Sequence, residues 1–541
     1  MTLISAKRTV LFVAIALCLL VAGLVPGLAQ ASGESYVYNM SFDHDGFTSV
    51  QILYYSGSAG SGASWVAVPA NFTATSVRAV VGTISSMKRV AYLVGTDKQP
   101  HPFYDNLTFS YISDSEPFSM RIRFNMTQGA MIVEPDGFFF SPQIGVPPYA
   151  AVQVILVLPD GVKALHEVQP APTRIDSLGS NMELFFSPAS ESRIAVTFTV
   201  SWPKQTSHIR EGIVDAEVPS RYLDLGGRMV ALYRAAVPLM NDLFNNTMNQ
   251  ILMRFFTPQT LPDVGIGGYT PMDPSSVQSG AVYLNLFYFR SLPGTMETIA
   301  IHELTHQYVV RAGVSSDLLW VHEGLANYVA VQMGKPLGYD VAPTDEELEA
   351  TARDLNGDYG FIQDWRPGGT TGSLFDYYAA SYQIFKTLGD EYGGVSMYAK
   401  FFRGVRELKD GLRSTNVAVY QLSLAAGANL SPQFREWKFE LVDLSSISAR
   451  IAKLRAEAEW YGPLLPFRAE ALAHLQMAES SMYSAPEVAM AHITIAAFYI
   501  ETVPMIIGGV VLVLSLLAVV AVIASRRSRR RRQESDSYAG L

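Results

Sequence analysis

The stretch TMETIAIHELTHQYVV, residues 295–310, decides how the rest of this 541-residue chain is interpreted. Its apolar residues recur at helical spacing, and Gly313 follows as a residue that ends helices. Positions four apart lie on the same face of a helix, so His302 and His306 point the same way. Two imidazoles at this spacing can bind one zinc ion, with Zn–N bonds of about 2.0–2.1 Å. Glu303 follows the first histidine, where it can take a proton from water at the metal.

A zinc ion with two histidine ligands needs a third protein ligand and one open position. The next helical stretch, WVHEGLANY at residues 320–328, contains Glu323, which a turn near Gly313 would bring back beside the histidines. His322 is the alternative ligand. Neighbouring helical residues point about 100° apart, so only one of the two can face the metal. Asn327 lies one turn beyond Glu323, and is either a partner that orients a ligand or an ordinary helix-surface residue.

Together the two stretches resemble those of the gluzincin zinc peptidases. The H-E-L-T-H and W-V-H-E-G-L-A-N-Y runs are similar to motifs of the aminopeptidase-N-like family and of the peptidase-MA-like and glycyl-aminopeptidase-like groups. The resemblance extends over about residues 217–400 and is sharp over 299–330. It implies a thermolysin-like, mainly helical catalytic domain with a small edge sheet, preceded by a β-rich domain. It also implies Zn²⁺ as cofactor, Glu303 as general base, and three zinc ligands: His302, His306 and Glu323.

Two features depart from the aminopeptidase-N-like pattern. The interval from His306 to Glu323 is two residues shorter. The G-x-M-E-N motif, which recognises a free substrate amino group in that family, has no match between Gly265 and Tyr288. The sequence therefore predicts a zinc metallopeptidase acting on peptide or protein substrates, with endopeptidase and aminopeptidase activity both open. The alternatives are a catalytically retired peptidase-like surface protein with a binding or adhesion role, and a zinc hydrolase of a small non-peptide substrate.

A downstream tyrosine and an upstream strand complete the expected site. In the families named above, a tyrosine donates a hydrogen bond to the oxyanion of the tetrahedral intermediate. The matching run, YYAASY at residues 377–382, favours Tyr378, with Tyr377 and Tyr382 behind it, although aromatic residues at helical spacing are usually core. A predicted strand at residues 281–289 is either an ordinary edge strand or one that pairs with the substrate backbone.

The residues before the catalytic region have the pattern of an all-β domain, which we place at residues 32–205. Apolar side chains alternate with small or polar ones in residues 193–202, and residues 120–124 and 152–158 are further strand-like runs. Turn signals such as Pro159-Asp160-Gly161 separate them. A β-sandwich is the architecture that buries such strands.

The pattern becomes mixed after this domain. Helical spacing over residues 219–245, followed by a strand-like run at 251–256, predicts an α+β catalytic domain at residues 206–445. Residues 446–500 are rich in Ala, Leu and Glu, and predict two or three helices that form either a stalk or a cap. The expected fold is thus a multidomain α+β chain.

Two apolar segments predict how the chain lies with respect to a membrane. Residues 1–31 have the charged start, apolar centre and small-residue end of a signal peptide, with an uncleaved anchor helix as the alternative. Residues 503–524 carry no charge, and at about 1.5 Å rise per residue they are long enough to cross a bilayer. The basic tail, residues 525–541, then stays in the cytoplasm, so the catalytic domain faces the outside of the cell membrane.

Composition narrows the expected partners. Residues 32–525 contain 32 basic and 47 acidic residues, a net charge of −15, which argues against nucleic acid as a partner. The single cysteine, Cys18, lies in the N-terminal apolar segment, so histidines and carboxylates must hold any metal. No pattern indicates an oligomeric state. Six N-x-S/T sequons are compatible with a surface glycoprotein: Asn39, Asn71, Asn106, Asn125, Asn245 and Asn429.

Overall fold

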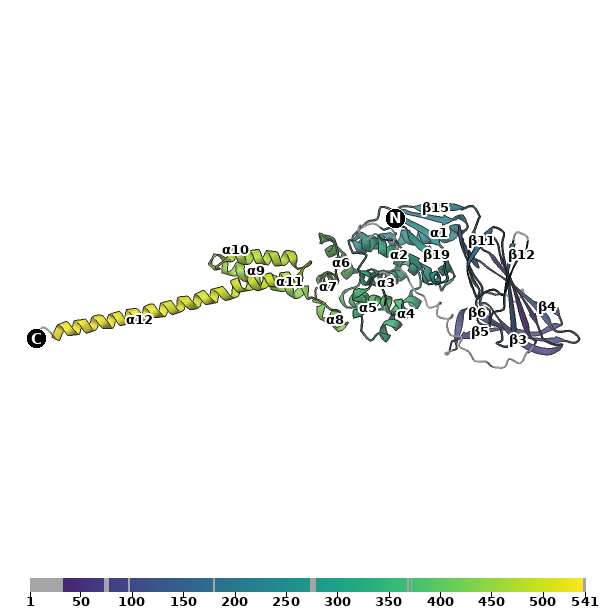
Figure 1. Ribbon diagram of the computed structural model, residues 1–541, viewed down its shortest axis with the longest axis horizontal. Helices are drawn as coiled ribbons and strands as arrows, with labels where there is room; N and C mark the ends of the chain where they lie inside the picture. Colours follow the sequence, from purple (N-terminus) through teal and green to yellow (C-terminus); the bar gives the residue numbers. More distant parts are fainter. Residues whose placement is uncertain are drawn as a thin grey trace. The chain divides into compact units, whose positions relative to one another are not determined.

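The computed structural model of the protein describes residues 33–72, 77–95, 98–178, 181–272, 279–366, 369–370 and 372–538. The predicted signal peptide lies outside these residues. The chain divides into two compact units, which we call unit 1 (Met1–Asn356 and Asp364–Phe402) and unit 2 (Gly357–Gln363 and Arg403–Leu541). The fold is mixed α+β, with sheets in the N-terminal part and helices in the C-terminal part (Figure 1).

Unit 1 begins with three β-sheets that share one hydrophobic core. The largest has seven strands in the order β12 (Arg174–Leu178), β13 (Asn181–Phe186), β10 (Ala151–Leu158), β1 (Ser35–Phe42), β2 (Thr48–Tyr55), β7 (Ser119–Met126) and β4 (Val77–Val81). The second has the order β11 (Val162–Gln169), β14 (Ala195–Val200), β9 (Asp136–Phe140) and β8 (Ala130–Val133). The third has the order β3 (Gly60–Pro69), β6 (Gln99–Ser113) and β5 (Thr83–Val94). The strands predicted at 120–124 and 152–158 are confirmed as β7 and β10.

Alternation along these strands explains the shared core. In β1 every second residue is buried, so Tyr36 and Tyr38 point to the same side of the sheet. They belong to one cluster with Val66 of β3 and with Phe139 and Val196 of the four-stranded sheet. Side chains from all three sheets therefore close a single apolar interior in the N-terminal part of unit 1.

A five-stranded mixed sheet follows in unit 1. Its order is β15 (Thr206–Glu211), β16 (Val214–Pro219), β17 (Ile251–Phe256), β19 (Val282–Asn285) and β18 (Gly268–Tyr269), with α1 (Leu223–Phe244) between β16 and β17 in the chain. β16, β17 and β19 are parallel, whereas β15 and β18 pair antiparallel at the two edges. The helix predicted at 219–245 and the strand at 251–256 are confirmed as α1 and β17.

The strand predicted at 281–289 is wrong in two respects. It ends at Asn285 and turns into a 3₁₀ helix, η5 (Leu286–Arg290), because the Asn285 side chain accepts a hydrogen bond from the backbone N–H of Phe287 at 3.0 Å. Such a side-chain bond offers the backbone an alternative to the sheet ladder. The strand is also internal, since β18 covers it and Gly268 pairs with Leu284 at the edge.

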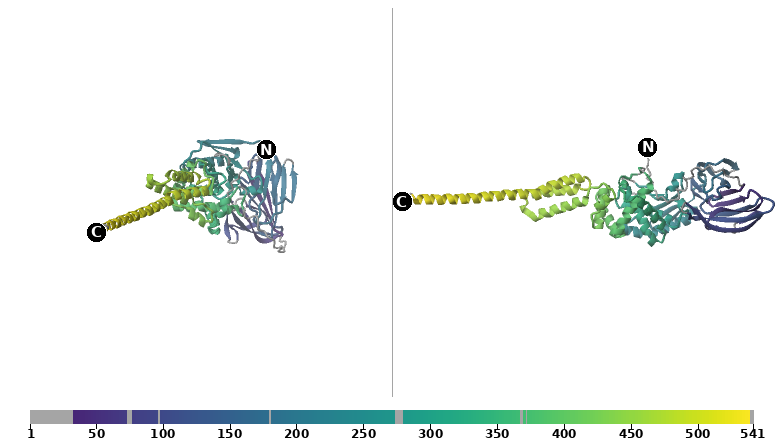
Figure 2. Two further views of the ribbon diagram at one scale, coloured as in Figure 1. Left: turned by 60° about the vertical axis from the view of Figure 1, so that its left-hand side comes forward. Right: turned by 90° about the horizontal axis from the view of Figure 1, so that it is seen from below.

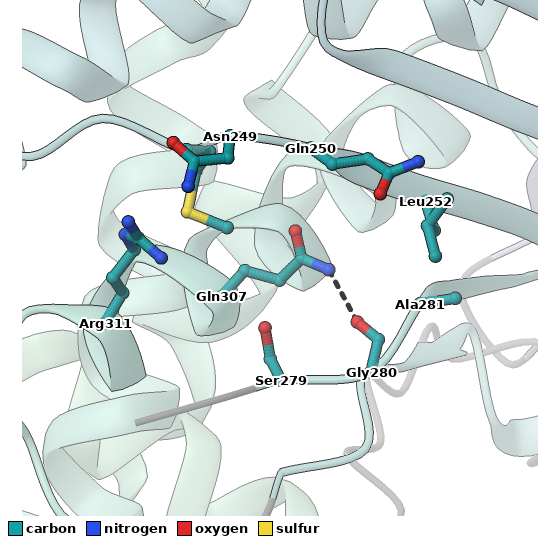
Figure 3. A pocket seen from close by; sticks show the side chains of 9 residues that line it. Asn249, Gln250, Leu252, Ser279, Gly280, Ala281, Gln307 and Arg311 are labelled. Carbon is teal, nitrogen blue, oxygen red and sulfur yellow. Dashed lines mark hydrogen bonds between the residues drawn. The ribbon is translucent and has the colours of Figure 1, made fainter. Parts of the chain in front are cut away.

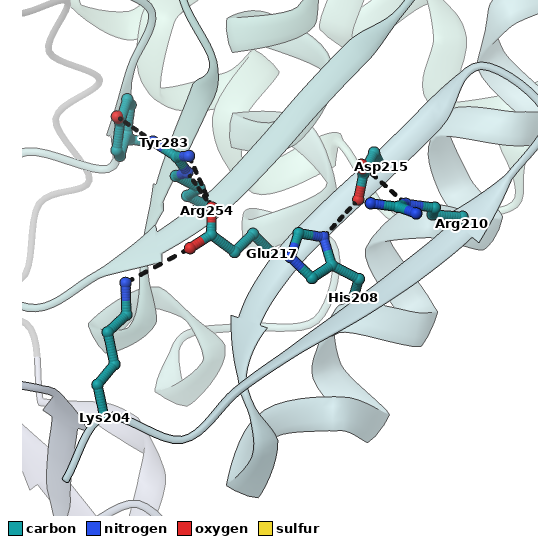
Figure 4. Close-up of polar contacts among 7 residues, drawn as sticks. All are labelled: Lys204, His208, Arg210, Asp215, Glu217, Arg254 and Tyr283. Carbon is teal, nitrogen blue, oxygen red and sulfur yellow. Dashed lines mark hydrogen bonds and ion pairs between the residues drawn. The ribbon is translucent and has the colours of Figure 1, made fainter.

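The outer side of this sheet carries a row of ion pairs (Figure 4). Arg254 donates through Nε to Glu217 at 2.8 Å and through Nη1 to the Tyr283 hydroxyl at 3.3 Å, which links β16, β17 and β19. Asp215 lies 2.9 Å from a ring nitrogen of His208 on the neighbouring strand. Exposed pairs of this kind contribute about 0–1 kcal/mol each. They make this face polar and leave the opposite face to pack on helices.

The remaining helices of unit 1 are α2 (Thr295–Arg311), α3 (Leu319–Leu337), α4 (Ala342–Asp354) and α5 (Leu374–Tyr392), and α6 (Val395–Glu407) runs into unit 2. α3 packs against both α2 and α5 (Figure 1). The predicted helix–turn–helix is thus present, and Gly313 in its turn has φ +96°, a conformation that glycine adopts without strain. At Gly324, an added Cβ would lie 2.5 Å from Phe385 Cδ2, so glycine permits the close approach of α3 and α5.

The named elements of unit 2 are helices joined by short connections. Its helices are α7 (Thr415–Ala426), α8 (Ser431–Glu436), α9 (Leu444–Tyr461), α10 (Arg468–Ser481), α11 (Pro486–Ala497), the π-helix η8 (Phe498–Thr502) and α12 (Val503–Tyr538). Figure 2 shows α12 as one uninterrupted helix, so helical structure continues beyond residue 524 into the basic segment. The helical stretch Pro486–Arg530 is long and apolar enough to cross a membrane, with a mean hydropathy of 3.1 in its most apolar window.

Candidate metal centre

Four ionisable side chains come together in the interior of unit 1, between α2 and α3. His302, Glu303 and His306 are 0% exposed, and Glu323 is 2% exposed. Charged and polar groups are buried in this way only when they find partners or hold a metal ion. The helix–turn–helix places Glu323 beside the two histidines.

The donor atoms form a compact triangle. Nε2 of His302 lies 3.1 Å from Nε2 of His306, and Glu323 Oε2 lies 3.2 Å and 3.5 Å from these two nitrogens. Donors bound at about 2.0–2.1 Å in a tetrahedron are about 3.3–3.4 Å apart. The three measured separations scatter around that value. The triangle thus fits three corners of a tetrahedral zinc site and leaves the fourth corner open.

Electrostatics set the protonation states that a metal ion requires. Burial lowers the pKa of His302, which keeps its imidazole neutral. Burial would raise the pKa of Glu323, but His306 and His302 outweigh it and lower that pKa to about 2. A neutral imidazole and a carboxylate are the forms that bind a metal cation.

Two further side chains surround the triangle. Asn327 Oδ1 lies 2.9 Å from Nδ1 of His302, so Nδ1 carries the hydrogen and Nε2 presents its lone pair to the centre. Asn327 is 1% exposed, so it is not the surface residue that the sequence left as an alternative. The ring of His322 stacks 5.8 Å from that of His306, and burial lowers the pKa of His322 to about 3.

Glu303 is held from the edge strand, a contact that sequence reasoning missed. The hydroxyl of Thr270, just after β18, lies 2.9 Å from the backbone oxygen of Glu303 and 3.1 Å from its Oε2, whereas Oε1 has no hydrogen-bond partner among the described residues. Burial raises the pKa of Glu303 well above its ordinary value, and the charge of Glu323 adds to this. The Gly-rich run before Thr270 was the signal: at Gly268 an added Cβ would lie 2.7 Å from Glu303 Cγ.

The three candidate tyrosines lie in different surroundings. The ring of Tyr378 is 6.4 Å from that of His302 and edge-on to Trp365. The hydroxyl of Tyr382 donates instead to Asp345 of α4. Tyr377 packs against Trp365 at 5.2 Å. Of the three, Tyr378 is the one whose ring lies against a residue of the triangle in the contacts described.

A pocket of about 340 Å³, lined by polar and apolar residues, lies further along α2 (Figure 3). Gln307 and Arg311 of α2, Asn249 and Gln250 ahead of β17, and Gly280 ahead of β19 are among its lining residues. Nε2 of Gln307 donates to the Gly280 oxygen at 2.7 Å, and its buried Oε1 has no partner among the described residues. Gln307, directly after His306, lines this pocket, and the sequence analysis did not single it out.

No family model and no curated protein matches the chain. Among solved structures, it is similar to aminopeptidase A of Legionella pneumophila in complex with aspartic acid (14% identity, TM-score 0.29), covering 75% of this chain and 49% of that one, about half its length. It is also similar to an M1 zinc metallopeptidase of Deinococcus radiodurans bound to a Tyr-Ser-Ala substrate. That match has 13% sequence identity and a TM-score of 0.31, and covers 76% of this chain and 96% of the other. A third match is an aminopeptidase N family protein of Idiomarina loihiensis, with 12% sequence identity and a TM-score of 0.34. It covers 75% of this chain and 77% of the other. At these TM-scores the assignment of function rests on the site itself.

Proposed function

We propose that this protein is a zinc metallopeptidase, with His302, His306 and Glu323 as zinc ligands and Glu303 as general base. The observation that carries the proposal is the triangle of donor atoms, whose sides of 3.1, 3.2 and 3.5 Å suit a tetrahedral zinc ion. Three protein ligands with one open position are typical of catalytic rather than structural zinc sites.

Glu303 also belongs to the metal-binding cluster by distance, since donor atoms of His302, Glu303 and His306 lie within 4.8 Å of one another. We assign it as base for two reasons. Glu323 Oε2 is within 3.5 Å of both Nε2 atoms and already completes the triangle. One oxygen of Glu303 is engaged by Thr270 and the other has no described partner, so it is available to accept a proton.

The bound zinc ion supplies a Lewis acid that acidifies water and polarises a scissile carbonyl. Glu303 accepts the proton of the attacking water and delivers it to the leaving amine, and the hydrogen bond from Thr270 keeps its carboxylate in place. Asn327 fixes the tautomer of His302. Tyr378 donates a hydrogen bond to the developing oxyanion, a role that its ring position beside His302 supports.

The substrate is a peptide or protein, and we place its backbone along the edge strand β18. An edge strand offers unpaired backbone groups to an extended peptide. The pocket at Gln307 is the recess that such a peptide would enter, because Gly280 and Ala281 line it directly ahead of β19 and the Gln307 Oε1 atom, which has no partner among the described residues, offers an acceptor. Endopeptidase and aminopeptidase action are both compatible with these features.

We further propose that the catalytic part faces the outside of the cell. The organisation is a signal peptide, an N-terminal β-sandwich, a thermolysin-like catalytic domain, a helical segment and one membrane helix with a cytoplasmic basic tail. The apolar side chains of α12 support the anchor, since Leu512 is 62% exposed and Leu514 59% exposed. A helix that exposes such residues on all sides is stable in a bilayer and not in water. The sequons make this exported part a candidate glycoprotein.

Zinc analysis and a peptide-library digest of the full chain in detergent test the proposal. We expect stoichiometric zinc and cleavage by the wild type, and zinc without cleavage by Glu303→Gln. Glu297→Gln is the matched control, because Glu297 lies on the same helix but pairs with Arg228 at 2.9 Å, away from the triangle. Zinc without cleavage of any peptide by the wild type would favour a retired binding protein or a hydrolase of small molecules. Cleavage that survives Glu303→Gln would refute the mechanism.

A further inference from the structure

A second cavity, of about 490 Å³, lies in unit 1 between the N-terminal sheets and the segment that leads into α2. Phe103, Tyr104 and Phe140 line it from the sheets, and Phe287 lines it from η5. Two arginines complete the lining, Arg193 just before β14 and Arg290 at the end of η5. No carboxylate belongs to the described lining. The cavity thus combines aromatic walls with two positive charges.

The contacts described for the two guanidinium groups are with neutral groups. Arg193 donates to the Tyr104 hydroxyl at 3.2 Å and to a backbone oxygen, and Arg290 donates to the backbone oxygen of Phe140 at 3.0 Å. Both also lie over the ring of Phe140, at 5.2 and 5.7 Å from its centroid. Among the described residues, no carboxylate is within ion-pair distance of either. Both arginines are half-buried, and neutral oxygens and ring faces compensate their charge only in part.

Another arginine of unit 1, Arg221, has its charge compensated by a carboxylate. Arg221, which joins the helical part to the strands β8 and β9, is paired with Glu134 between them, and both side chains are largely buried. The chain thus provides an acid beside Arg221, whereas no described carboxylate lies within ion-pair distance of Arg193 or Arg290.

The same excess of positive charge shifts the pKa values of neighbouring groups. Burial would raise the pKa of Tyr104, but the charges of Arg193 and Arg290 outweigh it and lower that pKa. Burial lowers the pKa of Arg290 to about 10, and the charge of Arg193 acts in the same direction. Burial, with Arg193 adding to it, lowers the pKa of His101 to about 4. The hydroxyl of Ser291 also lines the cavity, is buried, and has no hydrogen-bond partner among the described residues.

We propose that this cavity is a binding site for a small organic carboxylate, with its charged group between Arg193 and Arg290 and its apolar body against the rings of Phe140 and Phe287. Guanidinium groups bind carboxylates through paired hydrogen bonds. The Ser291 hydroxyl supplies a further donor, and the rings exclude water from the rest of the ligand. Because Ser291 lies four residues before the start of α2, an occupant contacts the segment that leads into the helix of His302.

The carboxylate has two possible sources. It is either a free small molecule or an acidic sugar of a glycan, because the sequon residues Asn71 and Asn125 also line the cavity and are exposed. Full-length protein made in a host that does not glycosylate it keeps the cavity open for a free probe. The Asn71→Gln and Asn125→Gln variants, made in a glycosylating host, then show whether an attached glycan fills the cavity and blocks that probe.

Benzoate and its neutral analogue benzamide are the probes for calorimetry and thermal shift, each at about 10 mM. We expect benzoate to bind the unglycosylated full-length protein with a dissociation constant on the order of 1 mM, and benzamide to bind far more weakly. Arg193→Gln and Arg290→Gln should each weaken benzoate binding about tenfold or more. Arg228→Gln is the matched control, because Arg228 also lies over a phenylalanine ring but pairs with Glu297 outside the cavity.

Three results would overturn the proposal: no benzoate binding by the folded wild type, equal binding of benzamide, or benzoate binding unchanged in the two cavity variants. Inorganic phosphate that binds where benzoate does not would refute the apolar part of the site. Where Arg290→Gln fails to fold, Arg193→Gln decides the outcome, with Ser291→Ala expected to weaken binding more mildly. None of these readouts depends on zinc or on peptide cleavage.

Discussion

Replacing Gly268 by alanine should slow peptide cleavage and leave zinc in place. Gly268 lies in the edge strand β18, where it pairs with Leu284 and faces Glu303. A Cβ at this position would lie 2.7 Å from Glu303 Cγ and 2.9 Å from the backbone oxygen of Tyr283. The Tyr283 oxygen belongs to the paired strand and cannot retreat. To restore an ordinary contact of 3.4 Å, the Glu303 side chain must move by about 0.7 Å.

A displacement of this size matters because Glu303 transfers the proton. A misplacement of about 1 Å in a reacting group costs on the order of 10²-fold in rate. We therefore expect kcat/KM of Gly268→Ala to fall about 10- to 100-fold, mostly in kcat. The zinc content should not change, because the added methyl group meets Glu303 and the strand rather than His302, His306 or Glu323.

The assay is hydrolysis of the peptide that the library digest identifies as best cleaved, with zinc measured by mass spectrometry in the same samples. Gly267→Ala is the matched control. Its Cβ would meet Ile299, at 2.9 Å from Cδ1, 3.1 Å from Cγ1 and 3.5 Å from Cγ2, and not Glu303, so activity should stay within about twofold of the wild type. Full activity of Gly268→Ala, or a parallel loss of zinc and activity, would show that β18 does not position Glu303 as described.

The remaining predictions concern metal affinity, acid–base balance and stability. Asn327→Leu leaves Nδ1 of His302 without its partner and should weaken zinc binding about 10- to 100-fold in a chelator competition, whereas Asn327→Asp, which keeps the acceptor, should retain most of the affinity. Metal-free Glu303→Gln should melt above the metal-free wild type at pH 7. Burial raises the pKa of Glu303, so the folded wild type is stabilised relative to the unfolded chain below the ordinary pKa of 4.5 and loses that stability as the pH rises. The difference in melting temperature between the two proteins should therefore close near pH 4. A difference that does not depend on pH would contradict this reasoning. Arg221→Met leaves the Glu134 carboxylate without its ion-pair partner and should lower the free energy of unfolding in urea by about 3–5 kcal/mol. The double variant with Glu134→Met should recover most of that stability. A double variant as unstable as the single one would argue against a buried ion pair.

Much of the site could be predicted because its geometry is local. His302, Glu303 and His306 lie within five residues on one helix, and helical spacing alone brings the two imidazoles to one face. The strands β7, β10 and β17 follow from short apolar runs for the same reason. Glu323 lies on the next helix, beyond one short turn, and a helix–turn–helix allows few arrangements of its two helices.

The error is local, whereas the omission involves segments far apart in the chain. The strand expected at 281–289 stops at Asn285 because a side-chain hydrogen bond competes with the sheet, and periodicity does not report such a bond. Thr270 reaches Glu303 from the position just after β18, 33 residues earlier in the chain, and the glycines before it indicate a close approach of the backbone without showing which group approaches.

The amino-acid sequence by itself determined the metal-binding motif, the β-rich start, the helical end and the apolar C-terminal segment, since each depends on residues close together along the chain. Only the tertiary structure decided which oxygen completes the donor triangle, which groups hold Glu303, and that Arg193 and Arg290 meet in one cavity without an acid. These depend on how the sheet edge, the helices and the N-terminal strands pack together. Packing brings together residues that lie far apart in the sequence at irregular intervals, so no periodic pattern predicts their contact.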